Sequence, residues 1–138
     1  MALEGNKAIV RRFVQEIFAE GRVDSVEALV SDGFVSHTWG STGDAGKPYL
    51  VSAMERLSTV LAEARFTIED MIAEDDRVAV RLTAEATQVG AFMGLPPSGK
   101  AYRIGEIHVF RIQAGQVVEH WHQYDQLVMM RQLGALPG

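Results

Sequence analysis

The hydrophobic periodicity of this chain changes once along its length, and this change restricts the fold more than any other feature. In residues 6–20 apolar side chains recur at intervals of three and four residues, as on one face of a helix. In residues 78–86 apolar and more polar side chains alternate, as on a half-buried strand. Helices followed by strands predict an α+β domain, and the chain length fits a single domain over residues 1–138.

The same two periods and the turn residues predict the remaining elements. A short helix is expected where Asp24 and Glu27 have capping-box spacing. The dipeptide Ala114-Gly115 suits a tight hairpin turn between the last two strands. The full set of further expected elements is helices over 26–30 and after Pro48, strands over 66–72, 101–112 and 117–125, and a C-terminal helix over 127–133.

Composition excludes several classes of function. Thirteen Lys and Arg against eighteen Asp and Glu give a net charge of −5, so we expect no nucleic-acid partner. Without cysteine there is no disulfide, no thiolate nucleophile and no sulfur-ligated metal. The chain contains neither a long apolar run nor the apolar core of a signal peptide, which predicts a cytoplasmic protein with no membrane partner.

Residues 94–101 almost spell a phosphate-binding loop, but three residues contradict that interpretation. Pro96 and Pro97 have no backbone N–H to offer a phosphate. Ala101 replaces the hydroxyl that would hold magnesium, and a strand rather than a helix is expected to follow. We therefore expect a rigid connection between strands, and no cofactor.

The sequence His120-x-His122 raises the question of a metal site. If Gln113 pairs with Gln116 and the ladder continues without a bulge, His122 lies opposite Ile107 and the remaining strand histidine, His108, points to the other face of the sheet. Two ligands without a third make a weak site. We therefore expect no metal centre, and interpret the pair as surface or subunit-interface histidines.

The same register collects ionisable and aromatic side chains on the opposite face of this hairpin, as in the wall of a pocket. Each group also has an ordinary structural interpretation: Asp125 as the cap of the C-terminal helix, and His108 as a hydrogen-bonded interior histidine. A bulge would change the register and with it this assignment. The residues assigned to this face are Tyr102, Ile104, Glu106, His108 and Phe110 from the first strand, and Glu119, Trp121, Gln123 and Asp125 from the second.

Four segments together resemble the SnoaL-like polyketide cyclases, which belong to the nuclear transport factor two-like superfamily. They are Ile9-Val10-Arg11-Arg12-Phe13, the connection 94–100, the strand His108-Val109-Phe110-Arg111-Ile112 running into Gly115, and the ending Asp125 to Gly134. The resemblance covers nearly the whole chain. It implies N-terminal helices packed on a strongly curved antiparallel sheet, forming a cone with an internal pocket, and a homodimer formed through the outer sheet surface.

The resemblance also implies an activity. In characterised cyclases an aspartate on the last strand is the general acid/base of an intramolecular aldol closure, without a metal or an organic cofactor, and a strand histidine contacts the substrate. By position these roles fall to Asp125 and His108. Further substrate contacts are expected from the remaining pocket residues and from the loop after residue 36, namely Trp121, Tyr102, Glu106, Phe110, His37 and Trp39.

Elementary chemistry agrees with a carboxylate base on this kind of scaffold. An apolar enclosure raises the pKa of a carboxyl group toward the operating pH, so that the group can remove a proton from a carbon between carbonyls. The expected substrate is thus a small hydrophobic carbonyl compound. Two alternative functions stay open: another acid/base reaction, such as isomerisation, dehydration or epoxide opening, and the binding of hydrophobic ligands without catalysis. For His37, a role in anchoring its loop also stays open.

Overall fold

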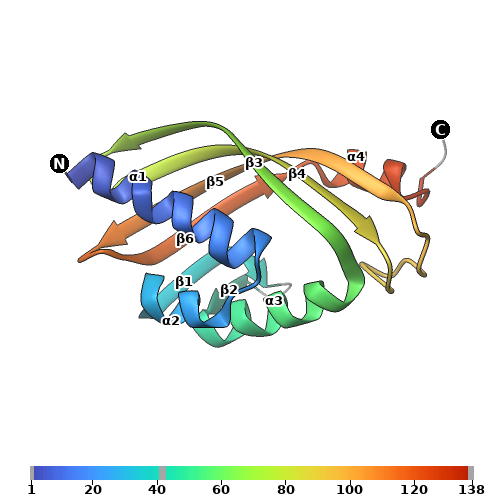
Figure 1. The fold of residues 1–138 in the computed structure, drawn as a ribbon, viewed down its shortest axis with the longest axis horizontal. Coiled ribbons are helices and arrows are strands. Elements are labelled where there is room, and N and C mark those ends of the chain that lie inside the picture. The colour runs from blue at the N-terminus through green and yellow to red at the C-terminus, as the bar shows by residue number, and fades with distance from the viewer. Residues whose placement is uncertain (1, 41–42, 137–138) are drawn as a thin grey trace.

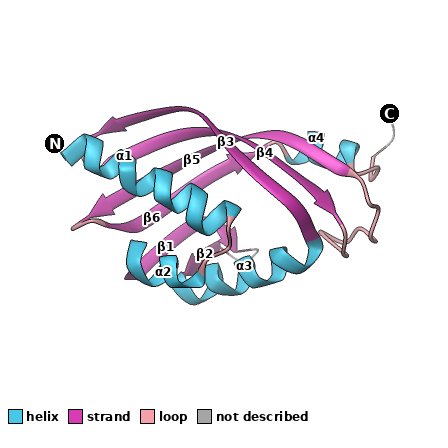
Figure 2. Ribbon diagram, in the orientation of Figure 1, coloured by secondary structure: helices cyan, strands magenta, loops and turns pink. Residues whose placement is uncertain are grey.

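The computed structural model describes residues 2–40 and 43–136, with the side chains of 38–40 and 43 left out of the description. The chain begins with helices and continues mainly with strands, as the periodicity predicts, but two strands come before the last of the N-terminal helices (Figures 1 and 2). In chain order they are α1 (Ala2–Arg12), the π-helix η1 (Phe13–Ala19), α2 (Val23–Leu29), β1 (Val30–Gly40), β2 (Gly43–Gly46), α3 (Lys47–Val60), β3 (Leu61–Glu74), β4 (Arg77–Gln88), β5 (Ala101–Gln113), β6 (Gln116–Tyr124) and α4 (Gln126–Gln132).

The strands form one open, six-stranded sheet in the order β2-β1-β6-β5-β4-β3. All neighbouring strands are antiparallel except β1 and β6, which run parallel, so the sheet is mixed. The α+β fold class is confirmed. The expectation of a wholly antiparallel sheet is wrong for this one pair, and β1 and β2 were not expected at all.

The helices α1, η1, α2 and α3 lie on one side of the curved sheet (Figure 2). Phe13 and Ile17 of η1 are fully buried against strand residues such as Val80 and Phe110. Alternate residues of β4 are buried along almost its whole length, which confirms the period-two pattern. The apolar core therefore lies between the helices and the inner face of the sheet. No helix in the described part of the chain is long and apolar enough to cross a membrane.

A bulge in β6 decides which side chains of the last hairpin face inward. The turn forms as predicted, with Ala114 and Gly115 both at positive φ (50° and 76°) and Gln113 opposite Gln116. After Ile112 and Val117, however, Arg111 lies opposite Glu119, so Val118 is an extra residue in β6. One extra residue reverses the facing of every later side chain.

The predicted register is therefore wrong beyond the first two pairs. His108 lies opposite His122, and Phe110 lies opposite His120, so the three histidines of β5 and β6 share the inner face. Tyr124 lies opposite Glu106 on the same face. The residues Glu119, Trp121, Gln123 and Asp125 are correspondingly removed from this face.

The junction between η1 and α2 is held by one carboxylate. Glu16 accepts hydrogen bonds from Arg12 Nε at 2.8 Å and from Ser25 Oγ at 2.7 Å. These two bonds, Arg12 first, lower the pKa of Glu16 from 4.5 to about 2. The ionised carboxylate thus stabilises the junction between η1 and α2, two helices whose buried residues belong to the core.

This junction makes folding stability depend on pH in the acid range. Because the folded-state pKa of Glu16 is depressed, its contribution is present above pH 4.5 and is lost as the pH falls toward 2. In Glu16→Gln, the free energy of unfolding, measured by urea titration, should fall less between pH 5 and 2 than in the unsubstituted protein. Equal slopes in the two proteins would contradict the assigned role of Glu16.

Candidate active site

A cavity of about 580 Å³ lies between the inner face of the sheet and the helices. Its walls are mainly apolar, with Phe18 of η1, Leu50 and Met54 of α3, and Phe66 and Ile104 of the sheet. Its volume suits a small organic molecule. The polar side chains that reach this cavity from β5 and β6 are Tyr102, Glu106, His108, His122 and Tyr124.

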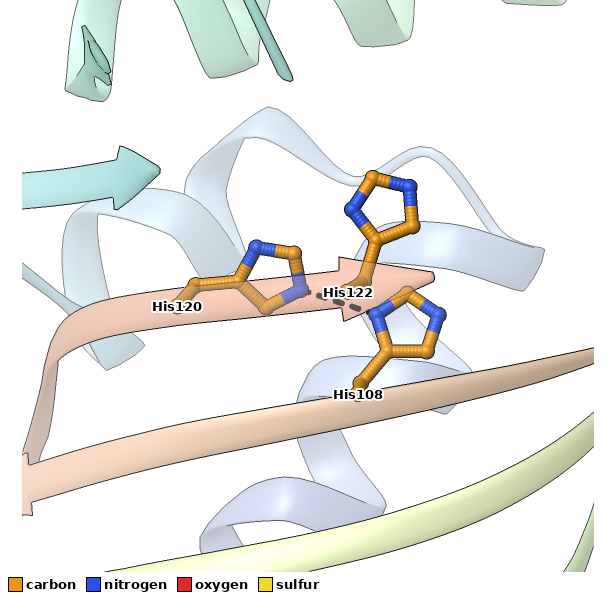
Figure 3. A group of neighbouring side chains, drawn as sticks. All are labelled: His108, His120 and His122. Carbon is orange, nitrogen blue, oxygen red and sulfur yellow. Dashed lines mark hydrogen bonds between the residues drawn. The ribbon is translucent and has the colours of Figure 1, made fainter. Parts of the chain in front are cut away.

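A chain of four hydrogen-bonded side chains runs from the interior to the cavity wall. Ser36 Oγ lies 3.0 Å from His120 Nδ1, and His120 Nε2 lies 2.8 Å from His108 Nδ1 (Figure 3). His108 Nε2 then lies 2.8 Å from Glu106 Oε1. Ser36 and His120 are fully buried, and His108 is nearly so. The series Ser36–His120–His108–Glu106 is called the histidine relay below.

The end of the relay fixes the proton positions along it. An ionised Glu106 can only accept, so His108 Nε2–H donates to it and His108 Nδ1 accepts. His120 Nε2–H must then donate to His108, and Ser36 Oγ–H must donate to His120 Nδ1. In this arrangement Ser36 Oγ, Glu106 Oε1 and both ring nitrogens of His108 and His120 are hydrogen-bonded.

His122 completes a stack of rings on the inner face. Its ring lies 4.9 Å from that of His108 and 5.6 Å from that of Tyr124, and both pairs are nearly parallel. Burial, followed by repulsion from His108, lowers the pKa of His122 from 6.5 to about 4. Burial likewise holds the pKa of His120 well below its ordinary value. Both histidines are therefore neutral at physiological pH.

Two tyrosines beside Glu106 keep their protons. Burial, with Glu106 and Tyr124 as lesser causes, raises the pKa of Tyr102 from 10.0 to about 12. Burial and then Glu106 raise the pKa of Tyr124 as well. The cavity thus places a carboxylate and two phenolic O–H donors within one apolar enclosure.

Four residues of the expected inner face lie where β5 was expected to place them. Tyr102, Ile104, Glu106 and His108 line the cavity. Phe110 shares their face but is fully buried and packs on Phe13, with ring centroids 4.9 Å apart. Phe110 therefore belongs to the core and does not line the cavity.

Trp121 and His37, expected to contact substrate, lie together on the outer face of the sheet. Their rings are stacked 5.0 Å apart, and Arg77 lies 5.2 Å above the Trp121 ring. His37 is hydrogen-bonded to Glu119 at 2.7 Å and to Asp44 at 3.0 Å. The Glu119 contact is the main cause that raises the pKa of His37. These contacts match the alternative role of His37 as a loop anchor, whereas the side chain of Trp39 lies outside the described residues.

Asp125 is exposed and does not belong to the cavity lining. Its carboxylate accepts a hydrogen bond from the backbone N–H of Val128 at 3.2 Å and caps the first turn of α4. The expectation that this carboxylate faces the pocket is wrong, because the bulge turns its strand over. The alternative interpretation of Asp125 as the cap of the C-terminal helix is the one that agrees with the structure.

Sequence reasoning missed His120, His122, Tyr124 and Ser36 as members of the inner face. One signal could have found the first three. Val117 and Val118 are adjacent apolar residues, and strict alternation cannot bury both on one side, so a phase change between Val117 and His120 was available. No comparable signal marks Ser36, because its position depends on the parallel pairing of β1 with β6.

The architecture and its cavity define a class of protein: an α+β domain of the nuclear transport factor two-like type, with helices on the inner face of a curved sheet. Within that class, the sequence model of the family described as SnoaL-like polyketide cyclase matches residues 8–133. The chain belongs to this family. A search of curated proteins gave no match.

Solved structures agree with this membership. The chain is similar to TsrD from Streptomyces laurentii, at 26% identity and a TM-score of 0.86, covering 96% of this chain and 97% of TsrD. It is similar to AclR from Streptomyces galilaeus, provisionally named a hydroxylase, at 26% identity and a TM-score of 0.85, covering 99% and 89%. A SnoaL-like polyketide cyclase from Agrobacterium tumefaciens, at 19% identity and a TM-score of 0.78 with coverage of 94% and 98%, shares the fold.

The capping role of Asp125 predicts a purely structural phenotype. Asp125→Ala removes the acceptor of the Val128 N–H bond and should lower the free energy of unfolding by about 1 kcal/mol. Asp125→Asn should retain most of that stability, because asparagine also caps helices. Chemical denaturation of the three proteins measures both effects. Equal stability of the alanine and aspartate proteins would contradict the role.

Proposed function

We propose that this protein is an enzyme that catalyses acid/base chemistry on a small hydrophobic carbonyl compound, most concretely an intramolecular aldol closure, with Glu106 as the base. The observation that carries the proposal is the position of Glu106. It lies on the wall of an apolar cavity and is held by His108, in a member of the SnoaL-like polyketide cyclase family.

Glu106 can serve both halves of such a reaction. Its carboxylate takes a proton from a carbon between two carbonyl groups, and the resulting enolate carbon attacks an internal carbonyl carbon to form the new C–C bond. The alkoxide formed there takes the same proton back from Glu106. The product is thus an isomer of the substrate, and no other reactant is consumed.

Neighbouring side chains have defined tasks in this scheme. Tyr102 and Tyr124 keep their O–H protons and are the donors available to an enolate oxygen in the cavity. His108 orients the carboxylate through Oε1 and is itself held by His120. Apolar residues such as Phe18 and Met54 exclude water and fold the substrate, so that the reacting atoms start close together.

Two isosteric substitutions test which carboxylate reacts. We expect Glu106→Gln to lower turnover by about 10²–10⁴-fold, as loss of a general base does, while ligand binding changes little. Asp125→Asn should retain turnover, because its carboxylate is exposed and caps α4. Turnover would be measured on a panel of aromatic polyketide esters, and binding by calorimetry.

The reverse result, loss with Asp125→Asn and retention with Glu106→Gln, would overturn the assignment to Glu106. Ligands that bind without any conversion across the panel would instead support a protein that only binds hydrophobic molecules. An isomerase or a dehydratase would use the same Glu106–His108 pair, and the identity of the product distinguishes these reactions from the cyclisation.

We also propose that the protein forms a homodimer through the outer face of the sheet. Ile72 of β3 and Ile107 of β5 lie on this face, and 70% and 53% of their respective surfaces are exposed. Large apolar side chains exposed on one face are typical of a surface covered by a partner. A second copy of the chain would cover them.

The dimer is tested with one substitution on each side of the molecule. Ile107→Asp should convert the dimer to a chain of 15.2 kDa, as measured by light scattering. Val23→Asp, on α2 and 40% exposed, is the matched control and should leave the mass of the dimer unchanged. A mass of one chain for the unsubstituted protein at micromolar concentration would refute the proposed dimer.

A further inference from the structure

We infer that His108, His120 and His122 form a binding site for one divalent transition-metal ion. Each of the three offers one ring nitrogen, and these nitrogens lie within 4.8 Å of one another. They project from two neighbouring strands, and His108 and His120 face each other directly (Figure 3). Three imidazoles with no thiolate or carboxylate ligand are a donor set that suits zinc, cobalt, nickel, copper and iron.

The distances between the donors are close to those a metal requires. Zinc–imidazole bonds are about 2.0–2.1 Å long, so nitrogens around a tetrahedral ion stand roughly 3.3 Å apart. His108 Nδ1 and His120 Nε2 are 2.8 Å apart and would separate slightly. His122 would move inward by rotation of its ring. The strand pairing of His108 with His122 already holds the two backbones side by side.

The partners of the remaining ring nitrogens resemble the outer shell of a metal site. Metal-bound histidines usually donate their other N–H to a carboxylate or another oxygen, which fixes the ring orientation. His108 Nε2 lies 2.8 Å from Glu106 Oε1, and His120 Nδ1 lies 3.0 Å from Ser36 Oγ. His108 and His120 therefore already have such a partner.

Metal binding would require only one proton to move within the site. In the relay, the proton between His120 and His108 is on His120 Nε2, the atom that would bind the metal. When the metal takes both facing nitrogens, this proton moves to His120 Nδ1, which then donates to Ser36 Oγ. The histidines enter and leave the reaction neutral, and no proton needs to be released.

The location of the site determines what the ion could do. His108 and His122 line the cavity, whereas His120 lies fully buried behind them, so an ion held by all three borders the cavity. Zinc sites with three protein ligands and one open position are typical of catalysis. A ligand carbonyl oxygen or a water molecule could occupy that position and be polarised.

The direct test is metal binding by the protein alone, after removal of any affinity tag and treatment with a chelator. We expect Co²⁺ to bind at about one ion per chain, with the intense visible absorption of a four-coordinate ion, and Zn²⁺ to displace it. The absence of this spectrum and of stoichiometric binding would overturn the proposal. Because no organic substrate is involved, failure here would leave the acid/base proposal untouched.

Substitutions assign the ion to these residues. His122→Phe retains a ring stacked beside His108 and Tyr124 but removes the nitrogen. It should weaken Zn²⁺ binding by more than about 100-fold, a larger loss than removal of an outer-shell hydrogen-bond partner causes. His37→Gln, which changes the histidine outside the cluster, should bind Zn²⁺ as the unsubstituted protein does. Equal affinity of His122→Phe and the unsubstituted protein would place the ion elsewhere and overturn the site.

A second variant keeps the test valid if His122→Phe does not fold. Glu106→Gln replaces the carboxylate behind His108 and should weaken Zn²⁺ binding by about 10–100-fold. Circular dichroism and the melting temperature establish that each variant is folded. A Glu106→Gln protein that is folded and retains full affinity would contradict the outer-shell role assigned to Glu106.

Discussion

The inner face of this protein depends on one extra residue in β6. Val118 shifts the ladder between β5 and β6 by one position, and because side chains alternate along a strand, every later residue reverses its direction. His120, His122 and Tyr124 thereby join Glu106 and His108 on the inner face. Without the bulge, Trp121 and Glu119 would face the helices, and the histidine relay could not form.

The relay explains how so many polar groups are buried in an apolar core. A buried polar atom without a partner costs free energy, and a buried charge costs more. Here each ring nitrogen of His108 and His120 is hydrogen-bonded, and in the described part of the chain no buried side-chain nitrogen or oxygen lacks a partner. The same bonds that satisfy the interior fix the orientation of Glu106 at the cavity wall.

The elements governed by local periodicity could be predicted from the sequence, and those governed by distant pairing could not. The helix before Gly21, the alternation of β4 and the Ala114-Gly115 turn all follow from neighbouring residues. Strand β1 was missed because Asp32 and Gly33 are typical of turns, and its parallel pairing with β6 joins segments far apart in the chain. Tyr102, Glu106 and His108 were placed on the correct face because side chains alternate without interruption along β5, whose pairing with β4 contains no bulge.

The two faces of the sheet give chemically identical side chains, His37 of β1 and His122 of β6, opposite properties. On the outer face, Glu119 and Asp44 raise the pKa of His37, so this imidazole tends toward the cation and forms ion pairs. On the inner face, burial lowers the pKa of His122 to about 4 and keeps the imidazole neutral, with one nitrogen able to accept a proton or bind a metal. Among the side chains of β5 and β6 that line the cavity, Glu106 is the one carboxylate, and the other charged lining residues, such as Glu20, Arg56 and Glu63, come from outside these two strands. On β5 and β6 the cavity therefore presents one carboxylate beside imidazole and phenol groups, which is the arrangement that the proposed removal of a carbon-bound proton by Glu106 would use.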